Sequence, residues 1–228
     1  MEKVLSDVLM SHYEDAMQEV RDNLSDLLEK FIAGNPNYGY YICGRTKESQ
    51  RIIEKLRRKC PEKASFDAKF VMDNVTDIAG VRIIFAPVAT SYNMNYFDKT
   101  LRYLPIRAFK ELIKEVALED DNNNIDIIYG FVNELVSNGF NIMPSRTKDY
   151  ISNPKESGYM SYHVTVVASN GFPVEIQIRN FIQHVYAEAE HTRYEGDPED
   201  EESNRILAEC ASYLKRSDNV YSGGERCL

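Results

Sequence analysis

The sequence predicts an α+β protein with a mixed β-sheet flanked by helices, and three patterns lead to this prediction. Residues 2–31 repeat apolar side chains at helical spacing. Residues 81–85 form a continuous apolar run, which is typical of a buried strand. Residues 159–167 and 172–178 alternate in character on either side of a Ser-Asn-Gly turn, as the two arms of an antiparallel hairpin do.

The composition is that of a globular protein with a real core. The 228 residues are 43% hydrophobic and 28% charged, which suits one domain with a helical appendage. A net charge of −9 argues against a general nucleic-acid coat, and the dense basic stretch is residues 45–59. Scattered cysteines without a CxxC pair favour neither a zinc knuckle nor a disulfide framework. With no secretory signal and no apolar run of about 20 residues, we expect a cytoplasmic protein that makes no use of a membrane.

The N-terminal part is expected to be a helix followed by a strand and a second helix. The first helix ends at the stop signals of residues 34–37, and residues 38–43 form a short strand. Gly44 is expected to open a turn into a helix that is apolar on one side and basic on the other. A strand that ends at a helix start is a favourable phosphate site. We treat residues 1–34 as an N-terminal helical segment.

The rest of the chain alternates strands and helices. The turn at residues 75–80 leads into the buried strand, and residues 88–124 are expected to be an inserted surface element, irregular at first and helical from 108 to 118. A helix over 125–137, a loop over 146–158 and the hairpin follow. Helices are then expected over the ranges 181–193 and 205–214. The central domain is predicted to span 35–194 and a helical tail 195–228.

One face of the predicted hairpin carries unusual polar groups. Glu175 and Gln177 lie opposite Tyr159 and His163, and Asp77 lies at the mouth of a neighbouring strand. Two carboxylates with few nitrogen or sulfur ligands nearby favour Mg²⁺ over zinc. Taken singly, each residue has a more common explanation: a turn residue at 77, a solvent-facing sheet at 175 and 177, and an ordinary strand histidine at 163.

Six segments in one order along the chain carry more weight than any single residue. They are GRTK at 44–47 with IIEKLRRK at 52–59, DIAGVR at 77–82, DYI at 149–151 with PK at 154–155, GYMSYH at 158–163, VEIQIR at 174–179, and EH at 190–191. From about residue 38 to 194 the chain resembles the synthetase domain of the RelA/SpoT family, in its small, single-domain alarmone synthetase form. The resemblance implies a nucleotidyltransferase-like sheet. It also implies transfer of the β,γ-pyrophosphate of ATP to the 3′-hydroxyl of GDP or GTP, which makes (p)ppGpp.

The resemblance also implies roles on the ATP side. Arg45 and Arg82 match the arginines that sandwich the adenine, and planar guanidinium groups suit stacking on an aromatic base. Lys47 matches a lysine that contacts the donor phosphates. Asp77 and Glu175 match the magnesium ligands and are the expected catalytic residues, with Glu175 also a candidate to assist deprotonation of the acceptor.

On the acceptor side, Tyr159 matches the tyrosine that stacks on the guanine base. Lys155 and His163 are expected to meet the acceptor phosphates, and Gln177 is expected to orient the site. The chain departs from the family pattern at Arg51, where a serine is usual. No HD-type hydrolase motif is found, so we expect synthesis without degradation.

Other functions remain open at this point. Toxic members of the family pyrophosphorylate the 3′ end of tRNA and block translation, often with an antitoxin as partner. A catalytically silent nucleotide sensor is a third possibility, which the two retained carboxylates disfavour. The amphipathic helix over 2–31 suits either a homo-oligomer interface or the core of one subunit.

Overall fold

A five-stranded mixed β-sheet forms the centre of the molecule in a computed structural model of the chain. The structure describes residues 7–63, 65–101, 103–116, 124–195 and 200–218. The strands are β1 Tyr38–Thr46, β2 Ala79–Pro87, β3 Lys148–Asp149, β4 Tyr162–Val167 and β5 Pro173–Asn180. Their order across the sheet is β1-β2-β5-β4-β3. The β2–β5 pair is parallel and the other pairs are antiparallel, so the predicted mixed sheet is confirmed.

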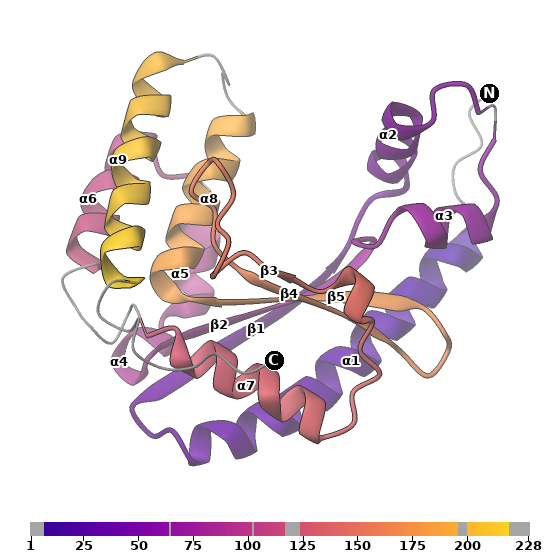
Figure 1. The fold of residues 1–228 in the computed structure, drawn as a ribbon, viewed down its shortest axis with the longest axis horizontal. Coiled ribbons are helices and arrows are strands. Elements are labelled where there is room, and N and C mark those ends of the chain that lie inside the picture. The colour runs from indigo at the N-terminus through magenta and orange to yellow at the C-terminus, as the bar shows by residue number, and fades with distance from the viewer. Residues whose placement is uncertain (1–6, 64, 102, 117–123, 196–199, 219–228) are drawn as a thin grey trace.

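Helices cover the sheet in separate groups (Figure 1). The helices α1 Asp7–Ala33 and α7 Asp126–Ser137 cross one face. On the other side, α2 Ser49–Lys59 and α3 Ala68–Asn74 stand at one end of the sheet. A second group stands at the other end and consists of α5 Met94–Leu101, α6 Ile106–Val116, α8 Phe181–Glu195 and α9 Glu201–Asp218. The short elements α4 Val88–Ser91 and η2 Pro144–Arg146 complete the described part.

The register of the strands gives the sheet one apolar and one polar face. On the apolar face Phe85 contacts Phe31 of α1 and Phe131 of α7, with ring centroids 5.8 and 5.5 Å away. On the opposite face, Arg82 pairs with Cys43 on β1 and Gln177 on β5. Because neighbours in register point to the same side of a sheet, the polar residues of three strands are gathered on one surface.

The N-terminal helix is confirmed, and its apolar stripe packs on the sheet. Leu9, Tyr13, Val20 and Leu24 are buried against it, whereas Leu5 lies outside the described residues. None of the helices in the described ranges is long and apolar enough to cross a membrane.

Two strand boundaries differ from the sequence prediction. β1 continues through Thr46, so Gly44 lies inside a strand and not in a turn. The reason is packing: a Cβ at Gly44 would overlap the Met17 sulfur of α1, so glycine lets that helix approach the sheet. β4 begins at Tyr162, three residues later than expected, and Tyr159 therefore precedes the strand.

The helix predicted over 108–118 is confirmed as α6 Ile106–Val116, but the segment 88–124 is not the inserted surface element that we expected. Its described residues form α4, α5 and α6, and residues 117–123 lie outside the description. Met94, Leu101, Phe109 and Ile113 are all fully buried, because α5 and α6 pack against α8 and, for α6, also α9. The C-terminal helix is also longer than expected, Glu201–Asp218 in place of 205–214. The described part of segment 88–124 is therefore an integral part of the helical group beside the sheet.

Candidate active site

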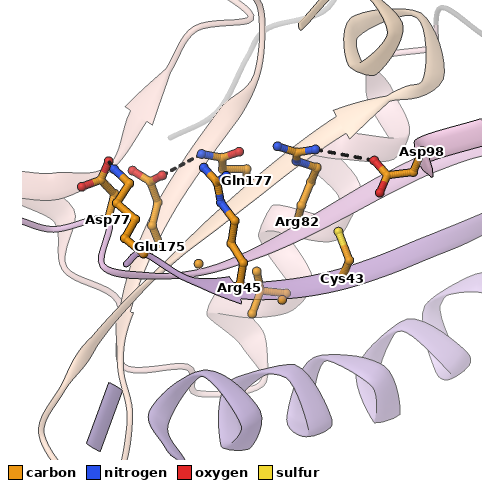
Figure 2. Close-up of a pocket in the computed structure, with 11 residues that line it drawn as sticks. Cys43, Arg45, Asp77, Arg82, Asp98, Glu175 and Gln177 are labelled. Atoms are coloured by element: carbon orange, nitrogen blue, oxygen red, sulfur yellow. Dashed lines mark hydrogen bonds and ion pairs between the residues drawn. The ribbon is translucent and has the colours of Figure 1, made fainter. Parts of the chain in front are cut away.

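The polar face of the sheet forms the floor of a cavity between the two groups of helices. Six of the predicted site residues line it: Arg45, Lys47, Asp77, Arg82, Glu175 and Gln177. They come from β1, β2, β5 and the connections that follow β1 and precede β2. Cys43 and Asp98 line the same cavity at the Arg82 end (Figure 2). Residues 130 positions apart in the chain thus face one space.

Asp77 sits at one end of the cavity between two lysines. Lys47 donates a hydrogen bond to one carboxylate oxygen, and Lys55 of α2 donates to the other at 2.7 Å. Burial by itself would raise the pKa of Asp77, but these two hydrogen bonds lower it to about 2. The Asp77 carboxyl is therefore ionised at neutral pH.

The pKa of Lys47 is set by its burial and by the charges around it. Burial lowers the pKa of Lys47, and the nearby cations Lys55 and Arg45 add to the effect, although Asp77 opposes it. Burial is the main cause of this shift. Three cations, Lys47, Lys55 and Arg45, act on the one carboxylate of Asp77 at this end of the cavity, so an anionic ligand such as a polyphosphate would balance their charge.

Glu175 lies on the neighbouring strand and faces the same cavity. Gln177 donates a hydrogen bond to its carboxylate at 2.8 Å, and His163 Nδ1 lies 3.3 Å from the other oxygen. Burial would raise the pKa of Glu175, but the contacts with His163 and Gln177 lower it. Burial lowers the pKa of His163 despite Glu175, so the imidazole is neutral at pH 7.

The two carboxylates fit the donor set of a magnesium ion. Both are ionised, both line the cavity, and oxygen ligands are those that Mg²⁺ prefers. Because Lys47 and Lys55 donate to both oxygens of Asp77, a metal ion would share this carboxylate with the lysines or replace them. The predicted metal site is compatible with the residues present.

A directed chain of hydrogen bonds joins the predicted acceptor residues to Glu175. Arg179 donates to the Tyr159 hydroxyl, which lies 3.0 Å from His163 Nε2. The ionised Glu175 can only accept, so the one proton of the neutral His163 ring lies on Nδ1 and is donated to Glu175. His163 Nε2 therefore accepts the proton of the Tyr159 hydroxyl, and the same hydroxyl accepts from Arg179. The order Arg179, Tyr159, His163, Glu175 fixes the tautomer of the histidine.

Three of the four predicted acceptor residues, Lys155, Tyr159 and His163, are not among the residues that line the cavity, whereas Gln177 is. Tyr159 is only 7% exposed. The Lys155 ammonium lies 4.2 Å from the centroid of the Tyr159 ring. Tyr150 contacts both the Tyr159 and His163 rings edge-on. A base that stacked on Tyr159 would have to take the place that the Lys155 ammonium holds in this structure.

The predicted adenine contacts, Arg45 and Arg82, are diagonal neighbours on the polar face. Arg45 pairs with Gly80, two residues before Arg82 on β2. Arg51, the departure from the family pattern, is exposed in the first turn of α2. The structure thus brings both arginines to the cavity, and their contact with a base stays a prediction.

Sequence reasoning did not single out three residues that hold this site together. Lys55 was only one member of the basic stretch, although its helical spacing from Arg51 placed it on the same side of α2. Asp98 lies in the segment 88–124, whose composition predicts an insertion and not a part of the site. Glu188 pairs with Arg82 at 2.8 Å, although the two residues are 106 positions apart in the sequence. No local sequence pattern predicts such a contact.

Comparisons with known proteins agree with this geometry. Residues 122–199 match the family model described as the region found in RelA / SpoT proteins. The chain is 30% identical over 215 residues to a guanosine-3′,5′-bis(diphosphate) 3′-pyrophosphohydrolase of Aquifex aeolicus, covering 89% of this chain and 24% of that protein. It is 28% identical over 200 residues to a probable chloroplastic GTP diphosphokinase of Arabidopsis thaliana, covering 85% and 21%. The chain therefore spans a quarter or less of the length of these two relatives.

Solved structures share the fold over nearly the whole chain. The small alarmone synthetase 1 of Bacillus subtilis, solved with its product pppGpp, superposes with a TM-score of 0.62 at 22% identity, covering 95% of this chain and 94% of that one. A GTP pyrophosphokinase family protein of Streptococcus pneumoniae gives 0.63 at 20% identity, covering 94% and 89%. The resemblance seen in the sequence is thereby confirmed: residues 122–199 match the region found in RelA and SpoT proteins, and the chain has the fold of the small alarmone synthetases.

Proposed function

We propose that the protein is an ATP-dependent pyrophosphokinase that transfers the β,γ-pyrophosphate of ATP to the 3′-hydroxyl of GDP or GTP, making (p)ppGpp. The observation that carries this proposal is the single cavity in which Arg45, Lys47 and Arg82 meet the ionised carboxylates of Asp77 and Glu175. The relatives named GTP diphosphokinase and the product-bound small synthetase support the same reaction.

On the donor side, the cavity offers a base platform at one end and phosphate partners at the other. Arg82 and Arg45 suit the adenine, because guanidinium planes stack on aromatic rings. Lys47 and Lys55, now paired with Asp77, are placed to take the ATP phosphates. The lowered pKa of Lys47, caused first by burial, fits a site that gains stability from an added anion.

In the chemical step, the acceptor 3′-oxygen attacks the β-phosphorus of ATP. The bond from that phosphorus to the α,β-bridging oxygen breaks, AMP leaves with the oxygen, and the acceptor hydroxyl loses its proton. Asp77 and Glu175 would hold Mg²⁺, and a metal ion bound there would supply positive charge to the oxygens of the transferred group.

Glu175 is the candidate to take the proton. Its lowered pKa, which His163 and Gln177 maintain against burial, makes it a weak base. Positioning by the chain from Arg179 to Glu175 therefore contributes more than basicity. On the acceptor side, Tyr159 takes the guanine and Lys155 takes phosphates, while His163 and Gln177 hold Glu175 in place.

The proposal is tested by offering separate acceptors. Purified protein is incubated with γ-labelled ATP and Mg²⁺ together with GDP, GTP or deacylated tRNA, and the products are separated by chromatography. We expect label in guanosine tetra- and pentaphosphate. Glu175→Gln should abolish it, whereas Glu111→Gln, which removes an exposed carboxylate of α6, should leave it unchanged.

The same experiment decides between classes of acceptor. Label on the 3′ end of tRNA alone would make the protein a translation-blocking toxin, for which an antitoxin partner is then expected. Nucleotide binding without any transfer would indicate a catalytically silent nucleotide sensor. Gel filtration of the same preparation reports whether the chain forms a homo-oligomer. A cytoplasmic location, where ATP, GDP and GTP are available, is part of the proposal.

A further inference from the structure

Asp98 reaches the cavity from α5, in the segment that the sequence suggested was an insertion. It is only 5% exposed and lines the cavity beside Arg82 (Figure 2). Its Oδ1 lies 3.8 Å from Arg82 Nη1, and the same nitrogen donates a hydrogen bond to Glu188 Oε1 of α8 at 2.8 Å. Two carboxylates from two helices therefore converge on one guanidinium of β2.

Asp98 and Glu188, which we call the carboxylate cradle, stabilise the charge of Arg82 in its buried position. Burial alone would lower the pKa of this guanidinium, and the charges of Glu188 and Asp98 raise it. An arginine side chain that is free to move loses rotamer entropy when it stacks on a ligand, so holding it in advance makes binding more favourable. The side chain of Arg82 keeps 18% of its surface exposed, which leaves it open to the cavity.

His184 completes the cluster without adding charge. Its Nε2 lies 3.3 Å from Asp98 Oδ1, and its Nδ1 lies 3.9 Å from Glu188 Oε1. Burial, with the nearby cation Arg82, lowers the pKa of His184 although Asp98 opposes the shift, so the ring is neutral. A neutral imidazole carries one N–H, so His184 orients Asp98, its nearer carboxylate, and adds no charge that would compete with Arg82.

The same three side chains have the spacing of a metal site, since their ligand atoms lie within 4.8 Å of one another. The Arg82 guanidinium, 2.8 Å from Glu188, already holds the position of the cation. A divalent ion added there would face the positive charge of Arg82 at close range. The arrangement favours a role in positioning the arginine.

We propose that Asp98 and Glu188 are positioning residues that fix Arg82 as the platform for the base of the donor nucleotide. The segment 88–124 then contributes to nucleotide affinity through Asp98. This inference rests on the assignment of Arg82 to the ATP base in the proposed function.

The test uses isosteric variants that remove one charge each, Asp98→Asn and Glu188→Gln. ATP binding is measured by titration calorimetry, and rates are measured over a range of ATP and acceptor concentrations. Each variant should raise the Kd and KM for ATP by about tenfold, the size of a lost cation–π contact. The kcat at saturating ATP and the KM of the acceptor should change less than about twofold. Glu202→Gln, which breaks the exposed pair with Arg107 in the same helical group, is the matched control.

A double-mutant cycle separates positioning from simple loss of structure. In an Arg82→Met background, Asp98→Asn and Glu188→Gln should have no further effect on the Kd for ATP, because they act through Arg82. Effects that add fully to that of Arg82→Met would overturn the inference. So would an unchanged Kd in either folded single variant. If one variant fails to fold, the cycle with the other still decides.

The binding measurement keeps the two proposals distinguishable. ATP binding without transfer to any acceptor overturns the proposed function, while the cycle still tests the cradle. Wild-type protein that binds no ATP overturns both. If the wild type transfers pyrophosphate but the effects in the double-mutant cycle are additive, only the inference about Asp98 and Glu188 is overturned.

Discussion

Asp77→Asn is the substitution whose effect the structure constrains most closely. It keeps the shape of the side chain but removes the charge that pairs with Lys47 and Lys55. The variant should bind ATP, because the lysines remain, and should lose Mg²⁺-dependent transfer by a factor of about 100 or more, as removal of a charge-stabilising group in other enzymes does. Asp73→Asn, at the exposed pair with Lys69 on the adjacent α3, is the matched control.

The same substitution has a calculable effect on stability. The pKa of Asp77 falls from its ordinary value of 3.8 to about 2 in the folded protein, because hydrogen bonds from Lys47 and Lys55 outweigh burial. At neutral pH the difference corresponds to a contribution of about 2 kcal/mol. Since the folded pKa is the lower one, this contribution is present above pH 4 and is lost as the pH falls toward 2. About half should be gone at pH 3.

Urea unfolding of the wild type and Asp77→Asn at pH 7, 5, 4 and 3 measures this directly. The difference in the free energy of unfolding should be constant from pH 7 to 5 and shrink below pH 4. A difference that stays the same down to pH 3, or that is absent at pH 7, would refute the assignment of Asp77 as an ionised, lysine-paired carboxylate. Asp73→Asn should differ little from the wild type throughout.

Three further predictions follow from the site and its supports. Lys47→Met should weaken ATP binding by about tenfold in a calorimetric titration and leave the KM of the acceptor unchanged. Tyr159→Phe removes the hydroxyl between Arg179 and His163 and should cost about 1–3 kcal/mol in urea unfolding, with a larger loss of acceptor use than of ATP binding. Gly44→Ala should destabilise the protein by about 1–3 kcal/mol, and Met17→Ala in the same chain should recover part of that loss, because the added Cβ meets the Met17 side chain. A loss at Gly44→Ala that Met17→Ala leaves untouched would contradict the packing explanation.

The sequence predicted the parts of the fold whose signal is local. The alternation around residues 169–171 gave the β4–β5 hairpin, and the helical stripe from Leu9 to Leu27 gave α1. The motif residues Arg45, Asp77, Arg82, Glu175 and Gln177 line one cavity in the structure, and their roles stay predictions.

What the sequence could not show depends on contacts between distant segments. The sequence of α5 looks irregular by itself, because its packing partner, α8, lies about 80 to 100 residues further along the chain. The helix α6 was expected, but its packing against α8 and α9 has no local signal. The pair of Arg82 with Glu188 spans 106 residues. The cover of Lys155 over Tyr159 is likewise set by a loop conformation that no residue pattern specifies.

The most direct test of the account is to count the products of the donor. ATP, GTP and Mg²⁺ are incubated with the wild-type protein, and AMP, ADP, phosphate and guanosine phosphates are quantified by chromatography and ³¹P NMR. The account predicts one AMP formed for each guanosine pentaphosphate, with no ADP, and no AMP when the acceptor is left out. ADP in place of AMP, or AMP that forms regardless of acceptor, would contradict pyrophosphate transfer.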